Sequence, residues 1–227
     1  MCGRFSFTAP KEKIQEQFNK IDTGNNLRIN FNIAPTQHAY VITDNNPRQL
    51  QSFSWGLIPY WSKDGKKTGK LINARTEGIF SKPSFRMPIR KRRCWVLADS
   101  FYEWRKENGR KIPYRIFMKS EQIMVMAGIW DTWGRGDQEV KSFSILTTPS
   151  NEELSGIHNR MPLILTDPEK QNLWLEELSL EKVFGLLNTP ENDILKMYRV
   201  SEKVNTVRNN DPELHEPVAE PPTLFDA

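Results

Sequence analysis

The sequence predicts a single domain that combines many short β-strands with a few short helices. Short apolar stretches of strand type recur between turn residues from residue 5 to residue 147. Patterns typical of helices are short and lie near the start of the chain and after residue 150. With 227 residues, 37% of them hydrophobic, and with no internal repeat or convincing linker, the chain fits one hydrophobic core. We therefore expect one domain over residues 1–208, followed by a tail over residues 209–227.

Alternation of apolar and polar residues, or a short apolar run, marks each predicted strand. These strands cover residues 5–7, 39–43, 49–55, 71–72, 94–98, 101–104, 113–118, 123–130, 142–147 and 163–165. Asn45-Asn46-Pro47 predicts a hairpin turn between the second and third of them.

The helices are predicted from capping residues and from apolar spacing. Pro10 suits the start of a helix that places Ile14 and Phe18 on one face. Ser150 and Glu153 have the spacing of a capping box, which predicts a short helix ending near Gly156. Two further helices are expected from Asp167-Pro168 onward and over residues 179–187.

The charge of the chain is unevenly distributed. The formal net charge is +4, but residues 209–227 contain five carboxylates and no lysine or arginine, so removing them leaves residues 1–208 at +9. A body this basic favours anionic partners, of which nucleic acid is the commonest, although a generic soluble surface is the alternative. The tail also holds four prolines, and we expect it to be poorly ordered.

Several classes of protein are disfavoured by composition. No run of about 18 apolar residues and no apolar signal region occurs, so we expect a cytoplasmic protein without a membrane partner. Two cysteines, Cys2 and Cys94, do not suggest a disulfide scaffold. Together with three histidines they show no paired ligand spacing, so we expect no metal site and no cofactor.

The first residues carry the most specific chemistry. If Met1 is removed, Cys2 bears both an α-amine and a thiol, and such a 1,2-aminothiol condenses with an aldehyde to a five-membered thiazolidine ring. Gly3 permits close approach of the backbone, and Arg4 adds a positive charge. An ordinary small residue at a frayed chain end is the alternative, but a strand follows at once.

Two neighbouring segments have the composition of a single-strand binding surface. Residues 55–61 contain Trp55, Tyr60 and Trp61 with a glycine and prolines between them, as expected of an ordered loop on which bases stack. Hydrophobic anchors beneath a loop are the alternative. Lysines follow at 63, 66, 67 and 70, and residues 86–93, which begin with Arg86, hold five basic side chains. A run of solvated surface charges is the alternative explanation for residues 86–93.

Three polar residues are candidates for chemistry, each with a simpler alternative. Glu103 shares a strand face with Phe101, which suits a general acid or base, but an exposed position is the alternative. His158 lies between a predicted helix and a strand, where a structural role is also common. Asn73 follows a predicted strand and would serve equally as the N-cap of a helix.

Seven motifs together resemble the SOS-response-associated peptidase (SRAP) family, in the order in which that family has them. They start at residues 1 (MCGRF), 32 (NIAPT), 55 (WGLIP), 73 (NARTE), 101 (FYEW), 127 (AGIW) and 158 (HNRMP), so the resemblance spans about residues 2–200. It implies a single α+β domain with a barrel-like β core, peripheral helices and a basic cleft for single-stranded DNA. The acidic tail lies outside it.

The resemblance also implies a function in the SOS response and DNA repair. Mature Cys2 would form a thiazolidine crosslink with the ring-opened aldehyde of an abasic site, after removal of Met1 by the protein itself or by an aminopeptidase. This lyase-like activity would shield the lesion, and we expect the protein to act as a monomer.

The motifs assign roles to individual residues in the same way. Asn73 would orient the Cys2 amine, Glu103 would act as the acid and base, and His158 would assist sugar ring opening. Arg75 and Arg160 correspond to phosphate-binding arginines, with Arg4 near the crosslink and Trp61 as a cleft aromatic; Arg86 belongs to the neighbouring basic run. From the chemistry we further expect nearby arginines to lower the pKa of the Cys2 amine and thiol.

Two other functions remain open at the level of sequence. A peptidase would use Cys2 as its nucleophile, with Glu103 and His158 as bases. A non-covalent reader of modified DNA bases would use the same cleft without chemistry.

Overall fold

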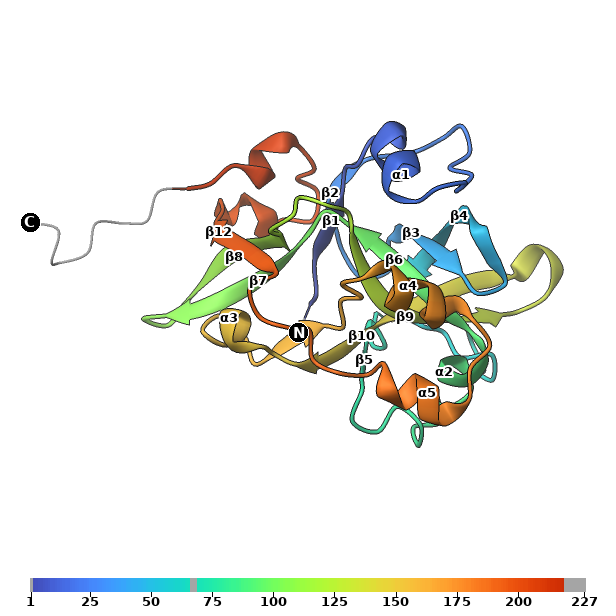
Figure 1. Cartoon of the computed structure of the whole chain (residues 1–227). Helices are drawn as coiled ribbons and strands as arrows, with labels where there is room; N and C mark the ends of the chain where they lie inside the picture. Colours follow the sequence, from blue (N-terminus) through green and yellow to red (C-terminus); the bar gives the residue numbers. More distant parts are fainter. Residues whose placement is uncertain (1, 66–68, 219–227) are drawn as a thin grey trace, which may run out of the picture.

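Five strands close into a β-barrel in the computed structural model, which describes residues 2–65 and 69–218 (Figure 1). They are β3 (His38–Thr43), β4 (Asn46–Trp55), β6 (Arg93–Ala98), β9 (Met124–Trp133) and β10 (Val140–Pro149). Antiparallel pairing runs β4-β3-β6-β9-β10, and a parallel pairing of β10 with β4 closes the ring. Two short strands extend β10 beyond the barrel, β5 (Asn73–Arg75) in parallel and β11 (Arg160–Pro162) antiparallel.

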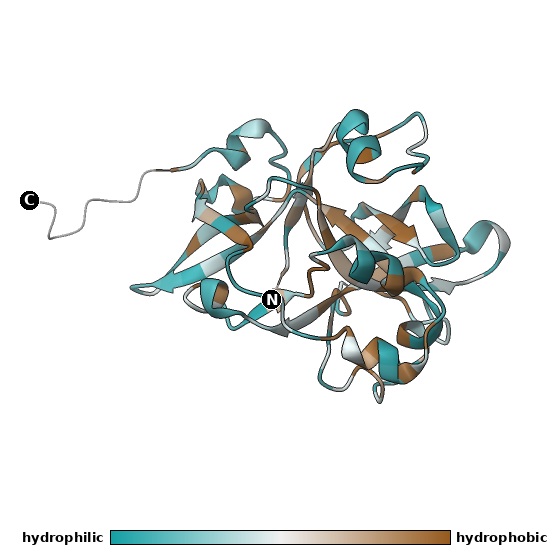
Figure 2. Ribbon diagram, in the orientation of Figure 1, coloured by the Kyte–Doolittle hydropathy of each residue, from teal (hydrophilic) through white to brown (hydrophobic). Residues whose placement is uncertain are grey.

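A second sheet of five strands packs beside the barrel in the order β12-β8-β7-β1-β2. Its members are β1 (Phe5–Phe7), β2 (Asn30–Ile33), β7 (Ser100–Glu107), β8 (Arg110–Met118) and β12 (Leu195–Arg199). The buried rings of Phe5 and Trp55 meet edge to face with centroids 4.8 Å apart, which joins the second sheet to the barrel. Figure 2 shows hydrophobic residues on the barrel strands, whereas the tip of the β7–β8 hairpin is hydrophilic.

The expectation of a single α+β domain with a barrel-like core is therefore confirmed. The predicted strands in the middle of the chain form, but β2 and β12 were not predicted, because their polar and charged residues hide the alternation. Residues 71–72 and 163–165 are not strands; the strands at these places are β5 and β11.

The helices are short and peripheral: α1 (Lys11–Gln17), α2 (Pro88–Lys91), α3 (Glu152–Ser155), α4 (Pro168–Leu175) and α5 (Leu180–Gly185). Asp167 caps α4 and Ser179 caps α5, as predicted from the sequence. The predicted capping box of Ser150 is wrong, because the Asn151 side chain accepts the Leu154 N–H and is the N-cap of α3.

The C-terminal segment is ordered further than predicted. The expectation of a poorly ordered chain from residue 209 is wrong for residues 209–218, which contain the 3₁₀ helix η3 (Pro212–His215). Leu214 is fully buried against Tyr102 and against Val204, which lies in the 3₁₀ helix η2 (Glu202–Asn205). An apolar anchor therefore offsets the acidic, proline-rich composition on which the expectation rested. Residues 219–227 lie outside the described residues.

Candidate functional site

Strands from both sheets meet at the N-terminus of the chain. Cys2 lies three residues before β1 begins. The neighbour of β1 is β7, which carries Glu103, while β5 carries Asn73. The Asn73 Nδ2 donates a hydrogen bond of 2.8 Å to the Cys2 carbonyl oxygen. Residues far apart in the sequence thus surround Cys2.

Cys2 is completely buried in the hydrophobic core cluster. Burial raises the pKa of its thiol well above the usual range, and the negative charge of Glu103 raises this pKa further. The expectation that nearby arginines lower this pKa is therefore wrong for the thiol. The thiol is neutral at pH 7, so its reaction needs a group that accepts the proton.

Asn73 lies on a strand and caps no helix, which excludes the simpler alternative for it. Its Nδ2 holds the Cys2 carbonyl, and its Oδ1 is buried without a hydrogen-bond partner. A buried amide oxygen without a donor is costly. In the described part of the chain, Oδ1 is thus an acceptor available for an N–H close to Cys2.

Glu103 is buried, with 3% of its surface exposed, so the alternative of an exposed carboxylate is excluded. The predicted alternation holds, since Phe101 belongs to the main core cluster while Tyr102 belongs to the smaller one. Glu103 is the second cause, after burial, of the raised Cys2 pKa, so the charge of its carboxylate acts on the thiol. A carboxylate in this position can accept a proton from the cysteine.

His158 and Arg160 form one turn at the start of β11. The backbone N–H of Arg160 donates to His158 Nδ1 over 3.0 Å, although the Arg160 carbonyl also lies 3.3 Å from that nitrogen. A backbone N–H can only donate, so the shorter contact makes Nδ1 the acceptor and places the proton of the neutral ring on Nε2. His158 thereby presents a donor.

The Arg160 guanidinium is engaged within the protein. It pairs in a bidentate manner with Glu77, one bond being 2.9 Å from Nη2 to Oε2, and it also donates to the Thr147 carbonyl. Arg160 is 9% exposed, and its hydrogen bond lowers the pKa of the Glu77 carboxyl. The sequence reasoning missed Glu77, although an acid within the NARTE motif was a signal that one of the arginines is paired.

The Arg4 guanidinium is likewise engaged within the protein. Its Nη1 donates to Asn32 Oδ1 and to the Val204 carbonyl, each over 2.7 Å. Burial lowers the pKa of Arg4. The structure therefore joins Arg4 to the C-terminal segment.

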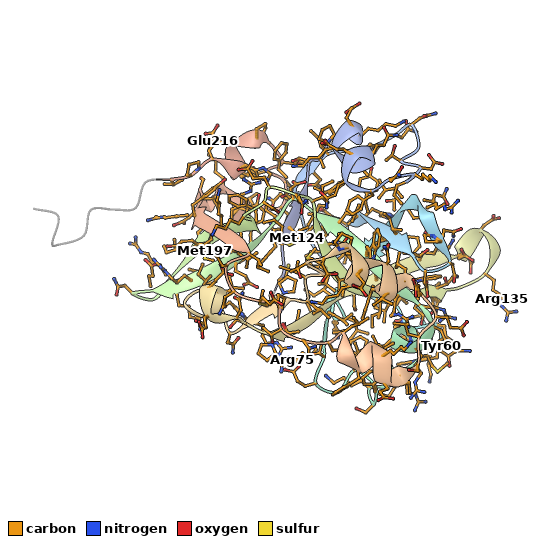
Figure 3. The ribbon with its side chains drawn as sticks, viewed as in Figure 1. Tyr60, Arg75, Met124, Arg135, Met197 and Glu216 are labelled. Atoms are coloured by element: carbon orange, nitrogen blue, oxygen red, sulfur yellow. The ribbon has the colours of Figure 1, made fainter. Side chains whose placement is uncertain are left out.

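The remaining predicted DNA-binding residues are on the surface. Arg75 and Arg86 are exposed, and Trp61 is 52% exposed. Figure 3 shows Arg75 at the lower edge of the molecule near β5, with Tyr60 on the same side of the view. A cavity of about 350 Å³ beside Asn73 is lined by Arg75 and Phe85, among others.

The aromatic loop contains both buried and exposed rings. Trp55 is a buried anchor, whereas Tyr60 and Trp61 project into solvent. The buried Asp131 carboxylate accepts the Tyr60 backbone N–H over 2.9 Å and so fixes the loop. Of the flanking lysines, Lys66 and Lys67 lie outside the described residues.

Arg93 does not belong to the basic surface predicted for residues 86–93. It is 1% exposed, and its guanidinium donates to four backbone carbonyls, those of Ile89, Arg90, Trp174 and Glu176. Its role is to hold the chain around α2 and α4 together.

Other features of the described residues lie apart from Cys2. A larger cavity of about 900 Å³ between α1 and α4 contains none of the predicted site residues. Within residues 2–65 and 69–218, no group of three or more histidine, cysteine, aspartate or glutamate side chains could hold a metal ion. None of the described helices is both long and apolar enough to cross a membrane.

Comparison of the chain with known families identifies one that covers almost all of it. The family model described as SOS response associated peptidase (SRAP) matches residues 1–207. The chain belongs to the SRAP family. The resemblance inferred from the seven motifs is thus confirmed.

Relatives of this SRAP chain carry the name abasic site processing protein. YoqW of Bacillus subtilis is 40% identical over 224 residues, which cover 95% of this chain and 99% of that protein. HMCES of Gallus gallus is 33% identical over 208 residues, which cover 80% of this chain and 61% of that protein. A solved structure from Bacteroides thetaiotaomicron, 32% identical, superposes with a TM-score of 0.86 over 96% of this chain and 100% of that chain.

Proposed function

We propose that this protein senses abasic sites in single-stranded DNA and captures them covalently through Cys2 after Met1 has been removed. The observation that carries the proposal is the group of Asn73 and Glu103 around Cys2 at the start of the chain. The names of the relatives and the SRAP family support abasic DNA as the partner.

The reaction is a condensation without redox change. The Cys2 amine attacks the open-chain aldehyde of the abasic sugar, and loss of one water gives a C=N bond. The sulfur then adds to the same carbon while the thiol proton is transferred, finally to the nitrogen, closing the thiazolidine. Ring closure is intramolecular, which favours it over attack by a separate thiol.

The surrounding residues meet the needs of these steps. Glu103 takes the proton from a thiol whose raised pKa would otherwise keep it neutral, and returns it to the nitrogen. Asn73 holds the Cys2 backbone through its Nδ2 and offers Oδ1 to the new α-amine. The Nε2–H of His158 donates to the sugar oxygen during ring opening.

Two finer points belong to the same proposal. The protein acts as a monomer. Arg75, Arg86 and the exposed ring of Trp61 hold the DNA strand, because exposed cations and aromatic rings bind single strands. The protein itself removes Met1 by cleaving the peptide bond between Met1 and Cys2. Glu103 is the base for this step, since the charge of Glu103 acts on Cys2.

Incubation of the purified protein with an oligonucleotide containing one abasic site tests the proposal. We expect an adduct that survives denaturing electrophoresis with the wild-type chain, and none with Cys2→Ala or with a chain that retains Met1. A Glu103→Gln chain should retain Met1 on intact mass measurement. An adduct of undiminished yield with Cys2→Ala would refute the proposal.

A further inference from the structure

Two side chains of the β9–β10 pair hold the backbone of the aromatic loop at alternate residues. Asp131 on β9 and Ser142 on β10 lie directly opposite each other in the antiparallel ladder. The Ile58 N–H donates to the Ser142 hydroxyl over 2.8 Å, and the Tyr60 N–H donates to the Asp131 carboxylate over 2.9 Å. One face of the pair is thus bonded to the loop.

A third side chain continues this attachment beyond the loop. Trp133 lies two residues after Asp131 on the same face of β9, and its indole Nε1 donates to the Ser62 carbonyl over 2.7 Å. The Trp133 ring also lies against Gly65, where an added methyl group would come within 2.4 Å of it. The chain is therefore fixed on both sides of Tyr60 and Trp61.

Among these side chains, Asp131 is the one that carries a charge. It is 1% exposed, and it also accepts hydrogen bonds from the Arg92 guanidinium and from the Thr132 N–H. Burial raises the pKa of its carboxyl, and a buried carboxylate costs stability. Ser142 binds a loop N–H without that cost. The carboxylate does more, because it joins the loop to Arg92 at the end of α2.

The stretch that is held in this way presents two rings to solvent. Tyr60 is 58% exposed and Trp61 is 52% exposed. An exposed ring on a free loop loses conformational freedom when it stacks on a base, which weakens binding. A backbone that is already fixed reduces this loss, since the rings then start from positions close to those they need.

We propose that Asp131 is a positioning residue for DNA binding, which holds the loop backbone so that the rings of Tyr60 and Trp61 are preset to stack on bases. The inference rests on the proposed function, which places the single strand on Trp61. Asp131 acts through the loop, and Arg92 is the counter-ion that keeps its carboxylate charged.

The direction of the effect of Asp131→Ala on DNA affinity tests the proposal. The change removes a negative charge and releases Arg92, so electrostatics alone would tighten the binding of an anionic strand. Loss of the preset loop should instead weaken it roughly three- to tenfold. Fluorescence anisotropy with a single-stranded oligonucleotide, in a Cys2→Ala background that forms no crosslink, gives the dissociation constants. Tighter or unchanged binding would overturn the proposal.

Asp44→Ala is the matched control for charge and burial. Asp44 is a partly buried carboxylate whose pKa burial also raises, and it accepts the indole N–H of Trp130 and the backbone N–H of Arg93. Its removal changes the net charge equally and breaks comparable bonds at a distance from the aromatic loop. We expect DNA binding to be unchanged or slightly tighter; weakening equal to that of Asp131→Ala would overturn the proposal.

A double-mutant cycle separates positioning from a general loss of structure. In a chain with Tyr60→Ala and Trp61→Ala, the Asp131→Ala change should alter affinity less than about twofold, whereas a purely structural role predicts the same weakening in both backgrounds. Trp133→Phe loses only the N–H donated to Ser62 and should weaken binding about twofold. If Asp131→Ala does not fold, unchanged binding by Trp133→Phe would overturn the proposal. Absence of crosslinking by the wild-type chain would refute the proposed function, while the binding comparison still decides the role of Asp131.

Discussion

At the scale of single residues, the account depends on what surrounds Cys2. The sequence predicted Cys2, Asn73 and Glu103 as a group through the family motifs, and the alternation of residues 101–104 placed Glu103 beside Phe101. It could not predict that Arg4 and Arg160 are engaged within the protein. Their partners, Val204 and Glu77, lie 200 and 83 residues away along the chain, and the acid in the NARTE motif does not indicate which arginine it pairs with.

Loss of the Asn73 amide should slow capture of abasic DNA. Asn73→Ala removes the 2.8 Å bond to the Cys2 carbonyl and the acceptor near the amine. Since one hydrogen bond contributes about 1 kcal/mol, we expect a rate roughly fivefold lower in a crosslinking time course. Asn25→Ala, a change at an exposed asparagine, serves as control. A rate equal to that of the wild-type chain would show that Asn73 does not orient Cys2.

Glu103→Gln should separate the acidity of the thiol from its reactivity. The charge of Glu103 raises the pKa of Cys2, so its removal lowers this pKa, and alkylation of Cys2 by iodoacetamide should rise at a lower pH than in the wild-type chain. Crosslinking should nevertheless fall by about 100-fold, because the proton acceptor is lost. Both chains must be compared after Met1 has been removed by an aminopeptidase. Faster crosslinking would assign Glu103 a purely electrostatic role.

At the scale of elements, the C-terminal segment supports the strands that carry the site. Asn32 on β2 donates to the carbonyls of Val204, Thr206 and Asn209 and accepts from Arg4. Asn32→Ala removes these four hydrogen bonds at once, so we expect the free energy of unfolding to fall by about 2–4 kcal/mol in urea denaturation. A loss below 0.5 kcal/mol, the usual range of surface changes, would contradict this role.

His215, in the same C-terminal segment, should make the stability of the folded protein depend on pH. Burial lowers the pKa of His215 to about 3, against 6.5 for an ordinary histidine. The unfolded chain thus binds a proton that the folded chain refuses, so stability is complete above pH 6.5 and declines as the pH falls toward 3, by up to about 1.4 kcal/mol per pH unit. His215→Phe keeps the ring beside Phe31 and should flatten this part of the profile. An unchanged profile would show that His215 titrates freely.

At the scale of the whole molecule, the proposed binding of a single strand should depend on charge. Residues 1–208 carry +9, and Arg75, Lys82 and Arg86 are exposed. Contacts with three to five phosphates would give a slope of log affinity against log salt of about −2 to −4 for single strands. Titrations of a Cys2→Ala chain with single-stranded DNA at several salt concentrations measure this slope. A slope near zero would mean that stacking alone holds the strand.

Much of this architecture could be predicted from the sequence. The parts that could not be predicted depend on contacts between residues distant along the chain. Apolar alternation predicted the barrel strands, because each buries one face in the core. The strands β2 and β12 escaped prediction, since their places depend on partners distant in sequence. The packing of residues 209–218 escaped for a similar reason, as a single leucine, Leu214, anchors an otherwise polar segment.

The central claim is that one amine and one thiol on the same residue capture the lesion. Intact mass spectrometry of the crosslinked product, followed by peptide mapping, tests it most directly. We predict the mass of the chain without Met1 plus the oligonucleotide minus one water, with the DNA attached to a peptide that begins at Cys2. An adduct that contains Met1, or one attached to a lysine, would contradict the account.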